Sequence, residues 1–336
     1  MRKYIIIAFI GLLCGCAKEN GYRALSCQNE KNADIQVIGQ PLEVGIPVDL
    51  CCQDNCLFVL AHSQKYWLHI YDKESGQLLS ENIMIGRGPG EGVNFVSMDY
   101  RRDEQNLYVF DMVLRKTVVY HLGGISGTAR YIREMEHPSE GVIRKCYTLP
   151  DGNFLYEGYL AGSDKNVRLT LSDGKSSIES YSEYPGISNE EDKYAFMLGV
   201  SKGDPDKGLY VCGTMFGSVL ECFDVNENHI QPKSLRLIDP PEMDLSGAGI
   251  QAKKGKKYGF MTFCLDGDMI YANYMDTTVP YKFNHIVSFD WKGRERVKYT
   301  ASQNILRLCP GEKTGKELYC IVSSPSSEFA LAKLIL

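Results

Sequence analysis

The chain has 336 residues, with 37 lysine and arginine residues against 42 aspartate and glutamate residues, and a formal net charge of −5 at pH 7. This acidic balance argues against nucleic acid or an anionic lipid surface as the main partner. Beyond the N-terminus no apolar run reaches the roughly 18 residues of a membrane helix, so we expect a soluble domain that buries its core without crosslinks.

The first fifteen residues have the pattern of a secretory signal peptide. Arg2 and Lys3 form a short basic region, and residues 4–13 form an apolar run. A helix of that length spans about 15 Å, half of a hydrocarbon core of ~30 Å, so the run is too short to cross a membrane. We therefore assign residues 1–15 to a processing segment and leave them out of the fold argument.

The end of this segment resembles a bacterial lipobox. Leu13 and Gly15 occupy the aliphatic and small positions before Cys16, which fits as the lipid acceptor. We expect the lipid on Cys16 to hold the protein in the cell envelope, at the outer membrane, facing the periplasm or the cell surface. The polar sequence that follows favours a tether over residues 16–33 and a folded domain over residues 34–336. An ordinary secreted protein without a lipid, or an unprocessed buried segment, is the alternative.

Strand patterns repeat through this domain. The runs are short, rich in β-branched and aromatic residues, and bounded by Gly, Asp, Asn or Pro. Equivalent positions of six successive units are separated by 50, 47, 55, 60 and 49 residues: Leu57, Leu107, Phe154, Leu209, Met269 and Leu318. A period of about 50 residues with four strands per unit is typical of a β-propeller blade. We predict an all-β fold, a six-bladed β-propeller.

The sixth unit lacks a fourth strand. Its third run, residues 329–335, reaches the end of the chain, whereas a closed propeller leaves no long sheet edge unpaired. The strand pattern at residues 35–38 has no unit of its own, so we predict that this N-terminal strand completes the last blade. In the fourth unit the pattern predicts a first strand over residues 195–200. Two β-sandwiches or a less symmetric β fold are the alternatives.

A glycine-rich hexapeptide follows the first unit: Gly86, Arg87, Gly88, Pro89, Gly90 and Glu91. Its glycines permit positive φ and its proline fixes φ near −65°, which favours a rigid turn from the outer strand of one blade to the channel. A phosphate-binding loop would need a following helix and a Lys-Ser/Thr pair, and neither is present. Either Arg87 or Glu91 lines the channel mouth, or the two form a surface pair.

Together, the lipobox, the six repeats and this Gly-x-Gly-Pro-Gly-Glu sequence resemble the TolB-like six-bladed propeller lipoproteins of Bacteroidetes. In that family the motif leads from the first blade to the second and is commonly followed by an aromatic residue. Here Gly92 and Val93 follow, and the first aromatic residue is Phe95. The resemblance covers nearly the whole mature chain. It implies a propeller in the cell envelope and implies no activity.

The cysteines show one cluster, Cys51, Cys52 and Cys56. A metal site, a local disulfide and plain strand packing are the possible explanations. The cluster lacks the paired Cys-x-x-Cys spacing of zinc sites, so packing is favoured, and we expect no metal and no cofactor.

Two insertions interrupt the strand pattern. Residues 188–193 are acidic, and residues 239–257 carry several lysines. Long loops on a rigid scaffold commonly carry binding sites, although plain solvated loops have the same composition.

The sequence shows no catalytic constellation. Its six histidines are dispersed, and no Gly-x-Ser-x-Gly elbow of a serine hydrolase occurs. Asp49 and Asp99 fall in predicted inner strands, where propeller lactonases and glycosidases place carboxylates around the channel. Aspartate also ends strands for turn chemistry, so these two residues remain candidates.

We therefore hypothesise a lipid-anchored binding module whose channel face or long loops engage an envelope protein or a glycan. The alternative is a lactonase- or lyase-like propeller enzyme that uses channel carboxylates. The enzyme hypothesis requires Asp49, Asp99 and Glu91 to lie together.

Overall fold

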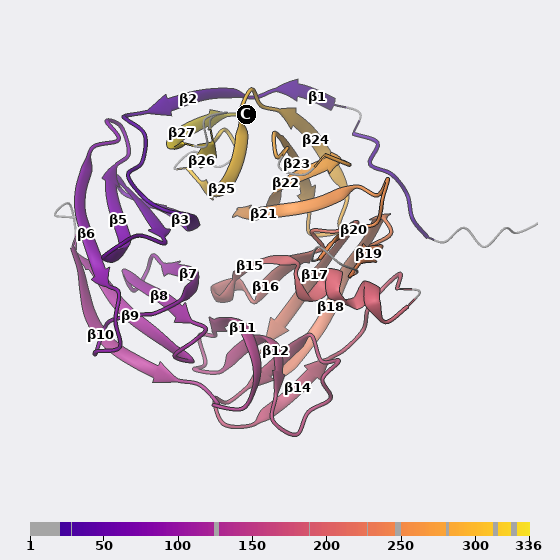
Figure 1. Cartoon of the computed structure of the whole chain (residues 1–336), viewed down its shortest axis with the longest axis horizontal. Helices are drawn as coiled ribbons and strands as arrows, with labels where there is room; N and C mark the ends of the chain where they lie inside the picture. Colours follow the sequence, from indigo (N-terminus) through magenta and orange to yellow (C-terminus); the bar gives the residue numbers. More distant parts are fainter. Residues whose placement is uncertain are drawn as a thin grey trace, which may run out of the picture.

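The computed structural model of the chain is a ring of six sheets around a central channel (Figure 1). The structure describes residues 21–27, 29–123, 128–187, 189–226, 228–245, 250–279, 282–311, 315–323 and 328–336. The predicted signal peptide and Cys16 lie outside these residues. No helix in the described ranges is long and apolar enough to cross a membrane.

Within each blade the strands follow one another from the channel to the rim. Blade 1 contains β3 (Pro47–Gln53), β4 (Cys56–Ala61), β5 (Tyr66–Asp72) and β6 (Leu78–Met84). Blade 2 contains β7 (Phe95–Arg101), β8 (Asn106–Asp111), β9 (Lys116–Gly123) and β10 (Thr128–Glu136). Blade 3 contains β11 (Gly141–Thr148), β12 (Phe154–Leu160), β13 (Leu169–Ser172) and β14 (Ser177–Tyr181).

The second half of the ring continues the same order. Blade 4 contains β15 (Val200–Asp204), β16 (Leu209–Gly213), β17 (Ser218–Asn226) and β18 (His229–Asp239). Blade 5 contains β21 (Tyr258–Asp266), β22 (Met269–Thr277), β23 (His285–Asp290) and β24 (Glu295–Thr300). Blade 6 contains β25 (Asn304–Pro310), β26 (Glu317–Ser323), β27 (Phe329–Ile335) and β2 (Asp34–Ile38).

The ring is closed by its two ends. Strand β2 pairs antiparallel with the last strand, β27, from Asp34 opposite Ile335 to Ile38 opposite Leu331. The prediction that an N-terminal strand completes the sixth blade is therefore confirmed, as is the six-bladed fold. Strand β2, drawn in indigo, lies beside the yellow strands of blade 6 in Figure 1.

The stretch predicted as a tether is attached to the ring over its described part. Strand β1 (Asn29–Asn32) pairs in parallel with β24, from Asn29 opposite Val297 to Asn32 opposite Thr300. Before it, the amide of Arg23 donates to the carbonyl of Leu237 in β18 at 2.9 Å. Residues 21–27 and 29–38 thus run along the outer edges of blades 4, 5 and 6 (Figure 1).

The core consists of apolar clusters between neighbouring blades, one at each of the six blade interfaces. Strand β4 is buried along its whole length, because it packs on both faces, whereas the outer strand β6 is largely exposed. The continuous apolar run at residues 57–60 follows from this two-sided packing. Rigid packing between blades fixes the inner strands, which line the channel.

The connections between blades hold the remaining elements. Residues before blade 4 form η1 (Glu191–Lys193) and α1 (Tyr194–Met197), so the prediction of a strand over residues 195–200 is wrong. The inner strand of blade 4 begins only at Val200, and η2 (Pro205–Lys207) follows it. Between blades 4 and 5 lies a two-stranded sheet, β19 (Met243–Asp244) and β20 (Gln251–Ala252).

Candidate binding site in the channel

The two faces of the ring differ in their connections. One face, here named the loop face, carries two kinds of connection. The first kind joins each blade to the next, and the second kind joins the second strand of a blade to its third, as between β4 and β5. It holds the glycine-rich hexapeptide, η1, α1 and the β19–β20 sheet. The opposite face, the turn face, carries short turns such as Asp54-Asn55 and Gly267-Asp268. Because inner strands begin at the loop face, the first residues of each inner strand surround the channel mouth there.

A cavity of about 390 Å³ opens on the loop face, and all six inner strands contribute to its wall. A second cavity of about 370 Å³ occupies the other end of the channel and includes Asp99 and Cys309 in its lining. Met98 and Lys202 border both cavities. The channel is therefore divided at mid-depth.

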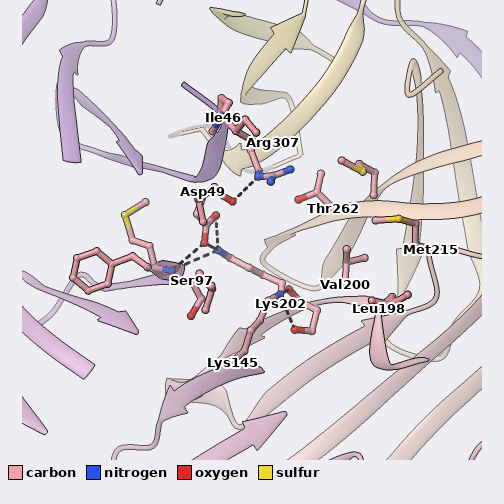
Figure 2. Close-up of a pocket in the computed structure, with 18 of the residues that line it drawn as sticks. Ile46, Asp49, Ser97, Lys145, Leu198, Val200, Lys202, Met215, Thr262 and Arg307 are labelled. Carbon is pink, nitrogen blue, oxygen red and sulfur yellow. Dashed lines mark hydrogen bonds and ion pairs between the residues drawn. The ribbon is translucent and has the colours of Figure 1, made fainter. Parts of the chain in front are cut away.

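The division is an ion pair between opposite blades. The ammonium of Lys202 in β15 lies 3.2 and 3.1 Å from the carboxylate oxygens of Asp49 in β3 (Figure 2). The amide of Met98 also donates to Asp49, at 3.2 Å. Burial alone lowers the pKa of Lys202, and the adjacent Asp49 carboxylate outweighs it, so the net shift is upward. Lys202 stays charged and fixed across the channel.

Arg307 in β25 adds a second cation to the loop-face cavity. Its Nε donates to the carbonyl of Val48 at 2.5 Å and its Nη1 donates to the carbonyl of Leu306 at 2.7 Å. Burial lowers the pKa of Arg307, and Asp49 offsets part of that shift. Arginine remains protonated in proteins, so the guanidinium is a fixed positive charge held by backbone carbonyls.

Lys145 in β11 supplies the third cation. Its ammonium donates to the carbonyl and hydroxyl oxygens of Ser201, each at 3.1 Å. The hydroxyl of Ser201 lies 2.8 Å from that of Tyr147 and contacts the Glu157 carboxylate. Figure 2 shows Lys145, Lys202 and Arg307 reaching the cavity from different strands.

Asp99 in β7 lies on the other side of the division, in the turn-face cavity. Burial raises its pKa to about 6, against the opposing effects of Lys202 and Arg101. Its Oδ2 lies 3.9 Å from Nε of Arg101. The structure thus places the two predicted channel aspartates at inner-strand positions but in separate cavities.

Comparisons with known proteins agree with this architecture. Residues 26–313 match the family described as TolB-like 6-blade propeller-like. The chain belongs to this family. A search of curated proteins finds no match.

Solved structures share the fold of this TolB-like propeller at low sequence identity. A protein of Bacteroides fragilis that is described as exported has 13% identity and a TM-score of 0.55, covering 92% of this chain and 98% of its own. A member of the DUF4221 family from Bacteroides vulgatus has 11% identity and a TM-score of 0.55, covering 90% and 98%. The Cps50 (Swd1) β-propeller domain of Myceliophthora thermophila has 9% identity and a TM-score of 0.53, covering 90% and 99%. These similarities establish the fold alone.

The hexapeptide of the TolB-like propeller is held by its own residues and by blade 2. The carboxylate of Glu91 accepts the amide of Gly88 at 2.8 Å. Gly90 has φ +70°, its amide donates to Glu134 at 2.8 Å, and its carbonyl accepts the hydroxyl of Tyr120 at 2.8 Å. Glu91 is thus used as a brace within the turn, while Arg87 is exposed.

Gly92 explains why the aromatic residue after the motif is delayed. A Cβ at Gly92 would lie 2.2 Å from the ring of Phe95, which is fully buried. The carbonyl of Gly92 accepts the indole N–H of Trp67 at 2.8 Å. The aromatic ring that follows the motif therefore fills the blade 1–2 interface from position 95.

The cysteines of the TolB-like propeller pack within or between strands. None of the ten described cysteines forms a disulfide, and Cys51, Cys52 and Cys56 pair through their backbones with β4 or β3 neighbours. Burial raises the pKa of Cys51 and of Cys309 well above the usual range, so these thiols stay protonated. Among the described residues no group of three or more His, Cys, Asp or Glu side chains is arranged to hold a metal ion.

The two predicted insertions contact each other on the loop face. Asp192 from the first accepts the amide of Met243 from the second at 3.0 Å. Two of the four lysines of the second insertion are in ion pairs: Lys256 lies 2.5 Å from Glu242 and Lys257 lies 2.7 Å from Asp276. The insertions therefore form a joint platform beside the channel mouth.

Three site residues were missing from the sequence-based list: Lys145, Lys202 and Arg307. They lie in three different blades and belong to no motif. Their only sequence signal is a cation at the inner-strand position of a blade, which can be read once the register of each blade is known.

Proposed function

We propose that this protein is a lipid-anchored binding module of the bacterial cell envelope, which holds a partner on its loop face. One observation carries the proposal: the cationic cavity, the long connections and the exposed apolar side chains all occur on that face. A rigid ring that presents its adaptable loops on one side is the usual arrangement of a binding scaffold.

The connections on the two faces differ in the apolar side chains that they expose. The loop-face connections expose large apolar side chains: Ile46, Ile85, Met112, Val113, Tyr194, Leu198, Ile250 and Val279. No exposed large apolar residue lies in a turn-face turn within the described ranges. Apolar surface of this kind on one face supports docking of a partner there.

The envelope location is supported by the sequence and by one relative. The first 16 residues have the lipobox pattern, and the similar protein from Bacteroides fragilis is described as exported. Lipid labelling tests the anchor: radiolabelled palmitate is expected in the wild-type protein and not in Cys16→Ala. Labelling of both forms alike, or of neither, would contradict the anchor.

The enzyme alternative has less support. It needs three carboxylates to converge, but Asp49 is paired with Lys202, Asp99 lies in the other cavity, and Glu91 braces the hexapeptide turn. A binding function requires no such convergence.

An affinity experiment with matched face variants tests the proposal. The mature lipidated protein is incubated with detergent-solubilised envelope, alongside a loop-face variant, Val113→Asp with Val279→Asp, and a turn-face variant, Lys292→Asp. Val113 and Val279 are 50% and 57% exposed, so the changes leave the core intact. We expect a partner that is retained by the wild type and Lys292→Asp and lost from the loop-face variant. Retention by the loop-face variant, or no partner for folded wild-type protein, would contradict the proposal.

A further inference from the structure

We propose that the loop-face cavity binds the C-terminal carboxylate of a polypeptide whose last residues are apolar. This inference rests on the binding function proposed above and specifies the ligand class of the same site.

The loop-face cavity is lined mainly by positive charges. Three cations line it, Lys145, Lys202 and Arg307, against one carboxylate, Asp49. The lining side chains therefore carry an excess of two positive charges in a chain whose formal charge is −5, and the Glu157 carboxylate behind Ser201 offsets part of this excess. Such a local excess within low-dielectric walls attracts and orients an anion.

Two of the cations, Lys145 and Arg307, have donors left for a ligand. The described hydrogen bonds of Lys145 go to neutral oxygens of Ser201, and those of Arg307 go to backbone carbonyls. The Glu157 carboxylate lies opposite Lys145 in the β11–β12 register and accepts the same Ser201 hydroxyl, so it offsets part of the charge of Lys145 and leaves that of Arg307 unaffected. A guanidinium has five N–H donors and an ammonium has three, so both can still bind a carboxylate through charge-assisted bonds.

The loop-face cavity ends at mid-depth of the channel. The Asp49–Lys202 pair crosses the channel from blade 1 to blade 4 and closes it at mid-depth. Because the pair crosses the channel, an extended chain that enters end first from the loop face has its terminus at this pair. A C-terminus brings its only backbone carboxylate to that end.

Aliphatic and thioether side chains form the apolar part of the cavity wall. Ile46 and Leu198 line the cavity with 66% and 38% of their surfaces exposed, and Met215 and Met261 also line it. The aromatic lining residues Phe95 and Tyr147 are buried against the blades. Aliphatic and thioether surface suits apolar side chains, whereas a sugar ring would need an open aromatic face.

The test compares peptide acids with their amides. An equimolar pool of hexapeptides, randomised among Ala, Val, Leu and Phe at the last three positions, is prepared in both forms. Each pool is passed over immobilised full-length mature protein, and the retained peptides are quantified by mass spectrometry. Because the two pools differ only in the terminal charge, we expect about tenfold or greater enrichment of the acids. Equal retention of acids and amides, or no retention by folded protein, would overturn the inference.

Variants identify the groups involved. Arg307→Gln and Lys145→Gln are expected to remove the preference for acids, Arg307→Lys to restore part of it, and Lys292→Gln on the turn face to leave it unchanged. Thermal unfolding checks the folding of each variant, and the partly exposed Lys145 provides the test if Arg307→Gln does not fold. An acid preference that survives in folded Lys145→Gln and Arg307→Gln would overturn the inference.

Two further results separate this inference from the proposed function. Oligogalacturonate supplies carboxylates on sugars, and its retention in place of the peptide acids would overturn the peptide assignment. A partner that depends on Val113 and Val279 but binds equally well to Arg307→Gln and Lys145→Gln would leave the binding function standing and refute the carboxylate site. Loss of the partner from these variants, together with the acid preference, would support both.

Discussion

The ammonium of Lys202 and the carboxylate of Asp49 join opposite blades across the centre of the ring, with Nζ 3.1 Å from Oδ2. The charge of Asp49 also raises the pKa of Arg307 against the effect of burial. One anion therefore acts on two cations. This arrangement makes the two partners of the pair unequal in their effect on stability.

Asp49→Asn is expected to destabilise the protein more than Lys202→Met. Removing the carboxylate takes the hydrogen-bonded counter-charge from Lys202, which keeps the longer-range attraction of Asp99, and it also takes the attraction of Asp49 from Arg307. Removing Lys202 leaves Asp49 with the attraction of Arg307. Removing one partner of a fully buried ion pair lowers the free energy of unfolding by about 3 kcal/mol or more. The loss is smaller here because both side chains are partly exposed. Urea unfolding of the two variants measures the difference. Equal destabilisation, or the reverse order, would show that Arg307 does not share the Asp49 charge.

A second ion pair, Arg168–Glu221, lies between blades 3 and 4. Both residues are buried; Nη1 of Arg168 lies 3.2 Å from Oε1 of Glu221, and Nη2 contacts Oε2. Glu221→Gln leaves a guanidinium without its counter-charge and is expected to cost about 3–5 kcal/mol. The double variant Arg168→Met with Glu221→Leu removes both charges and should cost less than Glu221→Gln alone. A double-mutant cycle by chemical denaturation checks this, and additive losses would contradict it.

Asp99 is expected to make the protein more stable as the pH falls from about 6 to about 4. Burial raises its pKa to about 6, so the folded state binds the proton more tightly than the unfolded state, whose carboxyl titrates near 4. Its side chain is 20% exposed, so the contribution is on the order of 1–2 kcal/mol after screening. Asp99→Asn should therefore be more stable than the wild type at about pH 7.5, and the gap should close at about pH 4. A gap that is independent of pH would count against the shifted pKa.

His137 is expected to act in the opposite direction. Its ring nitrogens lie 2.8 Å from the Thr117 hydroxyl and 3.0 Å from the Tyr156 hydroxyl, and burial lowers its pKa to about 4. Below about pH 6.5 the His137 imidazole is protonated in the unfolded state but stays neutral in the folded state. The free energy of unfolding therefore falls between about pH 6.5 and pH 4, by about 3 kcal/mol. His137→Gln should lack this component while being less stable at neutral pH. Parallel pH profiles of unfolding free energy for the two proteins would refute the assignment.

Closure by β2 predicts the effect of truncation. A protein that begins at Gly39 lacks β1 and β2, which leaves the edge of β27 unpaired and exposes the cluster that contains Ile38. We expect self-association and loss of cooperative unfolding, because an open strand edge pairs with other chains. A protein that begins at Gly21 is the control and should remain monomeric. Light scattering after size-exclusion chromatography distinguishes them, and a monomeric, cooperatively folded Gly39 form would contradict the role of β2.

The sequence predicts the ring well because each blade must bury its strands in the same way and therefore has a similar pattern of apolar residues. Apolar runs such as residues 57–60 recur at a regular period, and the deficit of one strand in blade 6 points to residues 35–38. The prediction fails at blade 4, where Ala195 lies in α1 and β15 contains Gly203. A Cβ at Gly203 would lie 2.5 Å from the Tyr210 ring, so close packing requires a residue that is a poor strand former.

The site is less accessible to sequence reasoning. Asp49 and Asp99 are found because a carboxylate at an inner-strand position suggests the channel. Lys145, Lys202 and Arg307 have the appearance of solvent-facing charges, and only closure of the ring brings three separate blades together around one cavity. The division of the channel by the Asp49–Lys202 pair depends on the register of both strands, which the pattern does not specify.

Site-specific photocrosslinking in intact cells tests the central claim most directly, because it reports which face meets the partner without removing it from the envelope. A benzophenone amino acid is placed at Ile46 on the loop face and, in a separate strain, at Lys292 on the turn face. The account predicts a discrete crosslinked partner from Ile46 and none from Lys292. A partner captured from Lys292 and not from Ile46 would contradict the assignment of the loop face as the binding surface.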